Sequence, residues 1–549
     1  MKITGAFFAG IFLLLCFFNF SRCGGDGNVI DTVACPIAPA VSKLLVAEKY
    51  YNEKVQLKTS VFYRAHEYKR TWLQKRHPDK MYDAFVKEVK ESATYGFVPE
   101  DYHIEALEND VKALYDDRKR TNADISMLDI RITASFFLFT THLLEGRIRM
   151  AGAREFLWEK GMPLENDIAL LLKMESASDL RKEMGKLHPE HPQYDRLQKA
   201  LKTYRELEAK DTLRPISTKI RLRPGESSDQ VPLVRRKIEL TDPKAGKPSS
   251  TTLYDDALVK SVREFQARHG LIPDGILDSK TAALLNVPIR QKKELIALNL
   301  ERLRWYPQIK GDKEEIVVNV PEYMLRVFRN NNEKLKMRVV LGSEYTPTPV
   351  FHDTLKYIVF SPTWIVPKSI FENEFLPKLK KDSFHFSTER YRFYKNGSEI
   401  DPTAQEWADE DFDTSGYTVI ENPGETNSLG NVKFIMPNDH SIYLHDTPAD
   451  HLFEREERAL SHGCVRLENP LALAEYLLRD QKEWNDKKIN AAMKAGKPVK
   501  VDLEKIYPVY IVYRTVWVDD QDQVHFFRDV YGHDQRHLDS LQRKVIAGL

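Results

Sequence analysis

A change in the spacing of apolar residues near residue 316 constrains the fold of this chain more than any other feature. Before it, apolar side chains recur every three to four residues over 81–92, 125–144 and 194–207, the period of amphipathic helices. After it, short alternating segments such as 316–320 and 335–341 have the texture of β-strands. The sequence therefore predicts a multidomain α+β protein that is helical first and mainly β afterwards.

The chain of 549 residues is long enough for two to four domains. Polar, glycine and proline-containing stretches give the boundaries. We expect a helical domain over 36–210, a linker over 211–224, a compact helical unit over 225–288, a β domain over 313–515 and a polar helical tail over 529–549. A structureless loop as long as 365–421 would be unusual, so we expect this insertion in the β domain to be partly helical.

The compact unit carries a clear helical pattern. Leu258, Val262 and Phe265 fall on one helix face. Gly270 is placed to end that helix, and Asp278 to cap the next one. A small helical module is the simplest interpretation.

The first 23 residues predict an export signal. Lys2 precedes an apolar run over 6–20, which fits a signal peptide and is short for a membrane span, although an uncleaved N-terminal anchor is the alternative. No later stretch of the sequence is long and apolar enough to suggest a span. Cys23 is either a lipidation site or a disulfide partner of Cys35, which leaves Cys464 as the odd thiol of an exported protein.

Composition excludes one class of partner. The formal net charge is +1, and the charged residues, which make up 30% of the chain, are mixed in sign. This balance gives no reason to expect nucleic-acid binding.

A cysteine in a glycine turn is the strongest sign of chemistry. Cys464 follows Gly463, and His445 lies upstream, so a nucleophile and a base to activate it are both present. The glycine permits a tight turn that could aim the amides of Gly463 and Cys464 at one point, as an oxyanion hole requires.

Two other interpretations stand beside it. A lone cysteine is more often an inert buried side chain than a nucleophile. His440, His445, His462 and Cys464 are all zinc-ligand types, but the close ligand pairs typical of zinc sites are absent from the sequence. We therefore predict no metal.

The motif Ser461-His462-Gly463-Cys464-Val465-Arg466, with His445 upstream, resembles the signature of the L,D-transpeptidases that cross-link bacterial peptidoglycan. The stretches at 427–430 and 433–434 resemble the sequence before their catalytic histidine, and those at 300–305, 318–321 and 362–367 resemble the large multidomain branch. In that branch the helical domain is a scaffold, and 365–421 corresponds to a capping subdomain over the active site. The unit at 225–288 resembles the type 1 peptidoglycan-binding domain, a three-helix module.

The resemblance implies a mechanism without cofactors. Cys464 would be the nucleophile and His445 the proton donor and acceptor. A donor tetrapeptide would acylate the thiol, and the amine of a second stem would resolve the thioester into a 3→3 cross-link. The family orients its histidine through a backbone carbonyl, here that of Asp446, and the Asp446 carboxylate is the less favoured alternative because adjacent strand side chains face opposite ways. Carbapenems would acylate the enzyme.

The remaining residues of the motif are expected to support this chemistry. Ser461 and His462 lie beside the glycine turn, and His462 is either a supporting donor or a packed side chain. Arg466 either pairs with a substrate carboxylate or forms a structural salt bridge. Tyr443 lies on the strand face of His445 and is a candidate wall of the site.

Two other functions remain open from the sequence. The same nucleophile and base would serve an L,D-carboxypeptidase that trims stem peptides, with water as the acceptor. A non-catalytic peptidoglycan-binding protein is the third possibility. All three predict a location in the periplasm or cell envelope, with N-terminal membrane attachment left open.

Overall fold

The computed structural model describes residues 53–148, 165–173, 177–242, 251–305, 314–386, 390–409 and 412–546. The expected leader, the cysteines at 23 and 35 and most of the loop at 241–252 lie outside these ranges. The chain divides into two compact units, one made of Met1–Asp83 with Ala106–Ala134 and the other of Ala84–Glu105 with Ser135–Leu549.

The first unit is helical and is organised around one buried carboxylate. It contains α3 (Glu53–Ala65) and parts of α4 (Lys80–Glu91), α5 (Ile104–Asp116) and α6 (Asn122–Glu145). Asp129 of α6 accepts hydrogen bonds from the Tyr63 hydroxyl and from the backbone amides of Trp72 and Leu73. These bonds compensate the cost of burying a polar group, so we assign the cluster a structural role.

Helix α6 is the one helix among the described residues that is long and apolar enough to span a membrane. This differs from the expectation that no segment after the leader is long and apolar enough to suggest a span. Within this helix, 78% of the most apolar window is buried inside the protein, as in the core helix of a globular domain.

Two long helices of the second unit, α9 (Pro192–Glu208) and α13 (Ile289–Trp305), pack together. Shorter helices in the same unit include η1 (Ser92–Tyr95), η2 (Pro99–Tyr102), α7 (Glu165–Leu172) and α8 (Ala177–Gly185). α9 and α13 share a core with the hairpin β14 (Val516–Val518) and β15 (Val524–Phe526). The helices predicted at 81–92, 125–144 and 194–207 are confirmed as α4, α6 and α9.

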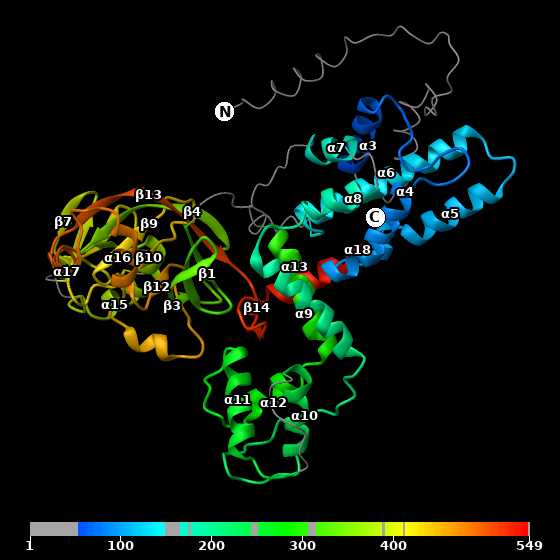
Figure 1. Cartoon of the computed structure of the whole chain (residues 1–549). Coiled ribbons are helices and arrows are strands. Elements are labelled where there is room, and N and C mark those ends of the chain that lie inside the picture. The colour runs from blue at the N-terminus through cyan, green and yellow to red at the C-terminus, as the bar shows by residue number, and fades with distance from the viewer. Residues whose placement is uncertain are drawn as a thin grey trace, which may run out of the picture. The chain divides into compact units, whose positions relative to one another are not determined.

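The compact helical unit has three helices, α10 (Val231–Thr241), α11 (Asp256–Arg268) and α12 (Ser279–Leu285) (Figure 1). Leu258, Val262 and Phe265 are buried in its core, as the helical period predicted. The Asp278 side chain accepts from the Thr281 amide, which confirms the predicted cap.

A nine-stranded sheet forms the β domain. Its order is β11-β3-β12-β10-β9-β4-β13-β1-β2, and an additional pairing of β2 with β3 closes it. The strands are β1 (Glu314–Asn319), β2 (Met324–Arg329), β3 (Asn332–Gly342), β4 (Phe351–Phe360), β9 (Val432–Ile435), β10 (Leu444–His445), β11 (Ala459–Ser461), β12 (Val465–Leu467) and β13 (Val499–Val512). Helices α16 (Pro470–Leu478) and α17 (Asp486–Met493) pack into the same hydrophobic core.

The insertion in this domain, residues 365–421, has a fold and a core of its own and is called the cap below. Its sheet has the order β5-β8-β6-β7, and aromatic side chains such as Phe371, Phe375 and Trp407 fill its core. Its elements are β5 (Trp364–Ile365), α14 (Lys368–Ile370), η4 (Phe371–Phe375), α15 (Leu376–Lys381), β6 (Tyr391–Lys395), β7 (Ser398–Ile400), η5 (Pro402–Ala404) and β8 (Tyr417–Glu421). The expected partly helical structure is confirmed.

The C-terminal segment is helical as expected, but it is anchored rather than free. α18 (His533–Ile546) places Asp534 2.6 Å from the guanidinium of Arg302, which is 1% exposed, on α13. No local pattern indicates this pair, because its members are far apart in the chain.

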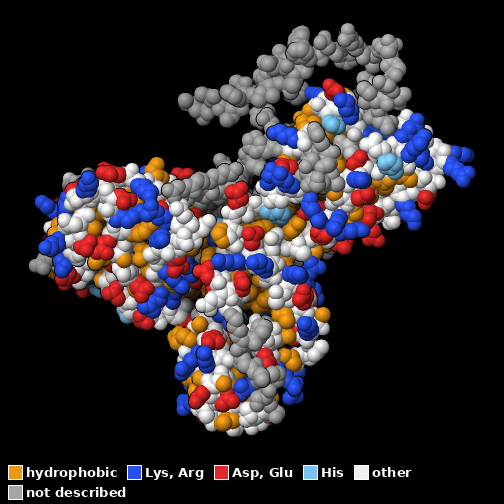
Figure 2. All heavy atoms as spheres, in the orientation of Figure 1, with side chains coloured by type: hydrophobic (Ala, Val, Ile, Leu, Met, Phe, Trp, Pro, Cys, Tyr) orange, Lys and Arg blue, Asp and Glu red, His pale blue; other side chains and the backbone are white. Residues whose placement is uncertain are grey.

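On the face shown in Figure 2, Lys and Arg side chains are intermixed with Asp and Glu, without one large patch of a single sign. The view agrees with the balanced net charge.

Candidate functional site

Three adjacent strands bring the predicted nucleophile and base together. Leu444 of β10 pairs with Phe434 of β9 on one side and with Val465 of β12 on the other. All three are fully buried in the core. Cys464 directly precedes Val465, and His445 directly follows Leu444, so the thiol loop and the histidine strand are immediate neighbours.

The backbone orients His445. Its Nδ1 lies 2.6 Å from the carbonyl oxygen of Asp446. A carbonyl can only accept, so Nδ1 carries the proton and the lone pair of the neutral ring is on Nε2. The Asp446 carboxylate is engaged elsewhere, because it accepts from the amides of Asn431 and Thr447, each at 2.7 Å. Of the two orienting groups considered, the carbonyl is the one in contact.

Burial keeps His445 neutral. The side chain is 4% exposed, and burial, with a smaller effect of Arg466 and then Lys433, lowers its pKa to about 3. The hydrogen bond to Asp446 opposes the shift only in part. At neutral pH the imidazole is therefore a free base.

Cys464 is half-buried, and its Sγ lies 3.8 Å from the Ser441 carbonyl oxygen, to which the thiol donates. Burial raises the pKa of this thiol, whereas Tyr443, Arg466 and Lys433 lower it in part. At neutral pH both groups are therefore uncharged, a thiol and an imidazole on neighbouring strand segments, and these protonation states are the ones that general-base activation requires.

The turn that holds the thiol needs its glycine. Gly463 has φ +118°, and a Cβ at this position would lie 3.2 Å from Cδ1 of Ile442. Ser461 clamps the turn from inside, because its Oγ accepts from the Gly463 amide at 3.1 Å and donates to the Cys464 carbonyl at 2.7 Å.

This clamp changes the expectation for the oxyanion donors. The Gly463 amide already has an acceptor in the Ser461 hydroxyl. The Cys464 amide has none among the described residues. One of the two expected donors is therefore available in this state, and the other requires Ser461 to rotate away.

The loop between β3 and β4 supports the turn, a role that the sequence alone does not indicate. Thr348 is 1% exposed, and its hydroxyl accepts from the Gly342 amide at 2.8 Å and donates to the Gly463 carbonyl at 2.7 Å. The exposed Thr346 hydroxyl donates to the Ser461 carbonyl at 3.0 Å. Only the pairing of β3 with β11 and β12 brings these residues together, so no local signal could have revealed them.

The other predicted residues take up distinct positions. Tyr443 lies beside the histidine, with ring centroids 5.6 Å apart, where a wall of the site was expected. His462 is exposed and pairs with Glu374 of the cap, so it is neither packed nor directed at the thiol. The Nε of Arg466 is buried and has no hydrogen-bond partner in the described part of the chain.

The four side chains considered as zinc ligands do not converge. His445 is bonded to Asp446, and His462 is bonded to Glu374. Across the ranges that the structure describes, no three His, Cys, Asp or Glu side chains are arranged to hold a metal ion.

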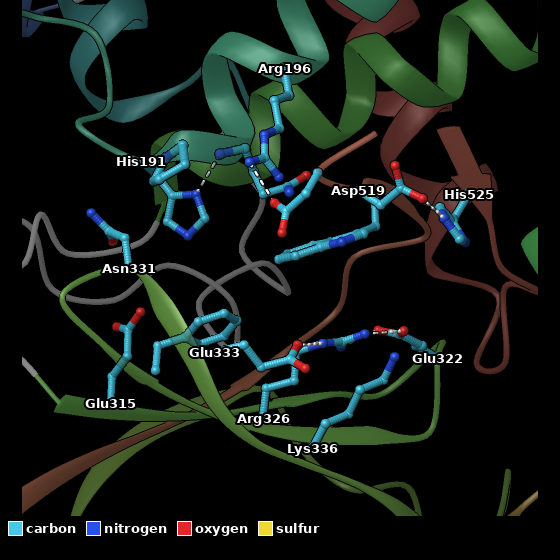
Figure 3. A pocket seen from close by; sticks show the side chains of 15 residues that line it. His191, Arg196, Glu315, Glu322, Arg326, Asn331, Glu333, Lys336, Asp519 and His525 are labelled. Carbon is cyan, nitrogen blue, oxygen red and sulfur yellow. Dashed lines mark hydrogen bonds and ion pairs between the residues drawn. The ribbon is translucent and has the colours of Figure 1, made fainter. Parts of the chain in front are cut away.

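Charged residues also gather at a separate cavity of about 270 Å³, between the start of α9, strands β1 to β3 and the β14–β15 hairpin (Figure 3). Its charges largely satisfy one another. Arg326 pairs with Glu322 and Glu333, and Asp519 pairs with His525. We therefore assign the ion pairs around this cavity a structural role.

Comparisons with known proteins match three parts of the chain. Residues 313–501 match the family profile of the L,D-transpeptidase catalytic domain, residues 58–201 that of the scaffold domain, and residues 239–285 that described as "Putative peptidoglycan binding domain". A Haemophilus influenzae protein named "Putative L,D-transpeptidase" is 34% identical over 242 residues, which are 44% of this chain and 48% of that protein. The chain thus spans about half the length of this curated relative.

Solved structures resemble this one only loosely. An L,D-transpeptidase from Mycobacterium smegmatis is 14% identical and covers 37% of this chain and 59% of its own, with a TM-score of 0.19. L,D-transpeptidase 1 from Mycobacterium tuberculosis is also 14% identical, covers 37% of this chain and 62% of its own, and has a TM-score of 0.16.

Proposed function

We propose that this chain, which carries an L,D-transpeptidase catalytic domain, a scaffold domain and a peptidoglycan-binding domain, forms 3→3 cross-links between peptidoglycan stem peptides. The observation that supports the proposal is the strand register, which pairs the strand of His445 with the strand that directly follows Cys464. The contact of Nδ1 with the Asp446 carbonyl makes Nε2 the proton acceptor of the neutral imidazole. The peptidoglycan-related domains imply a location at the cell envelope.

In the first step, Nε2 of His445 takes the thiol proton as Sγ of Cys464 attacks the carbonyl between the third stem residue and the terminal D-residue. A C–S bond forms, and the C–N bond to the D-residue breaks. The imidazolium returns its proton to the leaving amine, so a thioester on Cys464 and a free D-amino acid remain.

In the second step, the side-chain amine of another stem attacks the thioester. His445 accepts the amine proton and returns it to the thiolate as the C–S bond breaks. Attack by water in place of the amine gives L,D-carboxypeptidase activity on the same site. The chemistry uses only groups of the protein and its two peptide substrates.

The developing oxyanion needs a donor. The Cys464 amide is the available one, and the Gly463 amide would join when Ser461 turns its hydroxyl away. Loss of one such donor typically costs about 2.7–4 kcal/mol of transition-state stabilisation, so the Ser461 clamp is expected to affect the acylation rate.

The first test is intact-protein mass after incubation with a carbapenem. The parent should gain one equivalent of adduct, and Cys464→Ala, with the same circular dichroism spectrum, should gain none. Absence of an adduct on the folded parent would contradict the proposal and favour a non-catalytic peptidoglycan-binding protein. An adduct that persists in Cys464→Ala would contradict the assigned nucleophile.

Product analysis then separates the two enzymatic functions. Purified tetrapeptide stems should yield dimers joined through two third-position residues. Tripeptides without dimers would instead identify a trimming carboxypeptidase.

A further inference from the structure

Two cations flank His445 in one row across the sheet. Lys433 on β9 and Arg466 on β12 are the direct cross-strand partners of His445 on β10. Directly paired residues point to the same face, with Cβ atoms about 4.5–5.5 Å apart in an antiparallel pair. Their neighbours along the strands, Leu444, Val465 and Phe434, point to the other face of the sheet and fill the core. The row therefore faces the reacting groups.

Both cations are partly buried, and neither has an acidic partner in the described part of the chain. The Nζ of Lys433 donates to the Thr363 carbonyl at 3.2 Å and lies 5.8 Å from the centre of the Tyr443 ring. Within the described ranges Arg466 makes no ion pair, and its buried Nε lacks an acceptor there. Burial lowers the pKa of both groups, and the Cys464 thiolate is the anion that opposes the shift.

Three other arginines of the same domain that are at least partly buried each have an acidic partner. Arg326 pairs with Glu322, Arg338 with Glu468 and Arg479 with Glu314. Burying a charge without a partner is costly, so a pair of unmatched cations beside a nucleophile indicates that an anion from outside the protein completes the site.

We propose that Lys433 and Arg466 form an anion cradle that binds a carboxylate of the donor peptide next to the bond to be broken. This inference rests on the proposed function for the identity of the peptide. The free α-carboxylate of the terminal D-residue lies next to that bond. In stems whose diamino acid carries a second carboxylate, that group lies at the end of the side chain. Binding either one would make the enzyme selective for donor stems that bring a negative charge to the site.

A simpler role for the two cations is stabilisation of the thiolate. That role would speed attack on every electrophile equally, whether charged or neutral. An anion cradle would favour an anionic electrophile over a neutral one of the same shape. Iodoacetate and iodoacetamide form such a pair, since a carboxylate replaces an amide.

The test is the ratio of alkylation rates of Cys464 by iodoacetate and iodoacetamide, divided by the same ratio for glutathione. Charge-assisted hydrogen bonds from the two cations to the carboxylate of iodoacetate predict a normalised ratio of roughly ten for the parent chain. Lys433→Met and Arg466→Gln should each bring it most of the way to one. Lys336→Met, which removes an exposed cation of the same sheet, should leave it unchanged.

A normalised ratio of one in the unaltered protein would refute the anion cradle, and this test does not require any variant to fold. A ratio that stays near ten in both Lys433→Met and Arg466→Gln would also refute it. Effects on the thiol pKa cancel because both reagents need the same thiolate.

Peptide substrates then identify the bound carboxylate. Amidation of the terminal α-carboxylate, or of the diamino-acid carboxylate, should lower kcat/KM by roughly tenfold or more in the parent and much less in Lys433→Met. If neither amidation matters, the cradle does not bind substrate and the inference is wrong. If no peptide reacts while the preference for iodoacetate holds, the proposed function fails and the anion site stands.

Discussion

The buried threonine under the nucleophile turn offers a sharp test of how the site is held. Thr348 and Thr346 lie in one loop, and the hydroxyl of each donates to a backbone carbonyl of the turn, that of Gly463 or Ser461. Valine keeps the shape of threonine and removes the hydroxyl. Thr348→Val and Thr346→Val are therefore a matched pair that differs mainly in burial.

The expected magnitudes differ because water reaches only one of the two sites. Thr348→Val leaves the Gly463 carbonyl and the Gly342 amide without partners at a position that is 1% exposed. Each unsatisfied buried group costs about 1–3 kcal/mol, so the variant should lose at least about 2 kcal/mol. Thr346 is exposed, and the Ser461 carbonyl keeps its bond from the Ser343 amide, so its variant should stay within about 0.5 kcal/mol.

Scanning calorimetry and hydrogen exchange measure these effects. A loss of 2 kcal/mol should lower the unfolding midpoint of the β domain by at least about 4 °C. Exchange of peptides that cover 461–466 should accelerate by roughly 30-fold in Thr348→Val. Equal effects in the two variants, or no change in Thr348→Val, would refute the view that this buried hydroxyl holds the turn.

Four further predictions concern charge and strain. Because the pKa of His445 is about 3 and that of the thiol is raised, the rate of iodoacetamide alkylation should still be rising with pH at about 8.5, the ordinary pKa of a free thiol; a plateau reached by pH 7 would contradict the neutral pair. Between pH 3 and 6.5 His445 is protonated in the unfolded state and neutral in the folded state, so the parent protein loses stability as the pH falls through this window. His445→Gln should lose less stability than the parent between pH 7 and pH 4, and melting curves at these two pH values measure the difference. Gly463→Ala should slow carbapenem acylation by about 5- to 160-fold, since strain at φ +118° typically costs about 1–3 kcal/mol; an unchanged rate would count against the strained turn. Arg302→Met should cost about 3–5 kcal/mol by leaving Asp534 unpaired, and urea titration should show partial recovery on adding Asp534→Leu.

Much of the fold followed from local pattern. The helical period of 194–207 and the apolar face of Leu258, Val262 and Phe265 are properties of short segments, and the structure has the helices they predict. The Asp278 cap is equally local, because a side chain bonds an amide three residues away. Such features need no knowledge of what the segment packs against.

The packing of the C-terminal helix could not be predicted from local sequence. Arg302 and Asp534 lie on different helices, and neither carries a signal that names its partner. Expecting a polar tail was reasonable from composition alone, but packing turned the helix into part of the core.

The sequence by itself determined which groups are available for the proposed chemistry, because Cys464, His445 and the glycine beside the cysteine are all legible in the chain. Only the tertiary structure decided the state of those groups. Burial makes the imidazole a neutral base, and the Ser461 clamp occupies one expected oxyanion donor. Strand register, which is a long-range property, set Lys433 and Arg466 on either side of the base. Electrostatics depends on such distances and on burial, and both arise only when distant segments pack together.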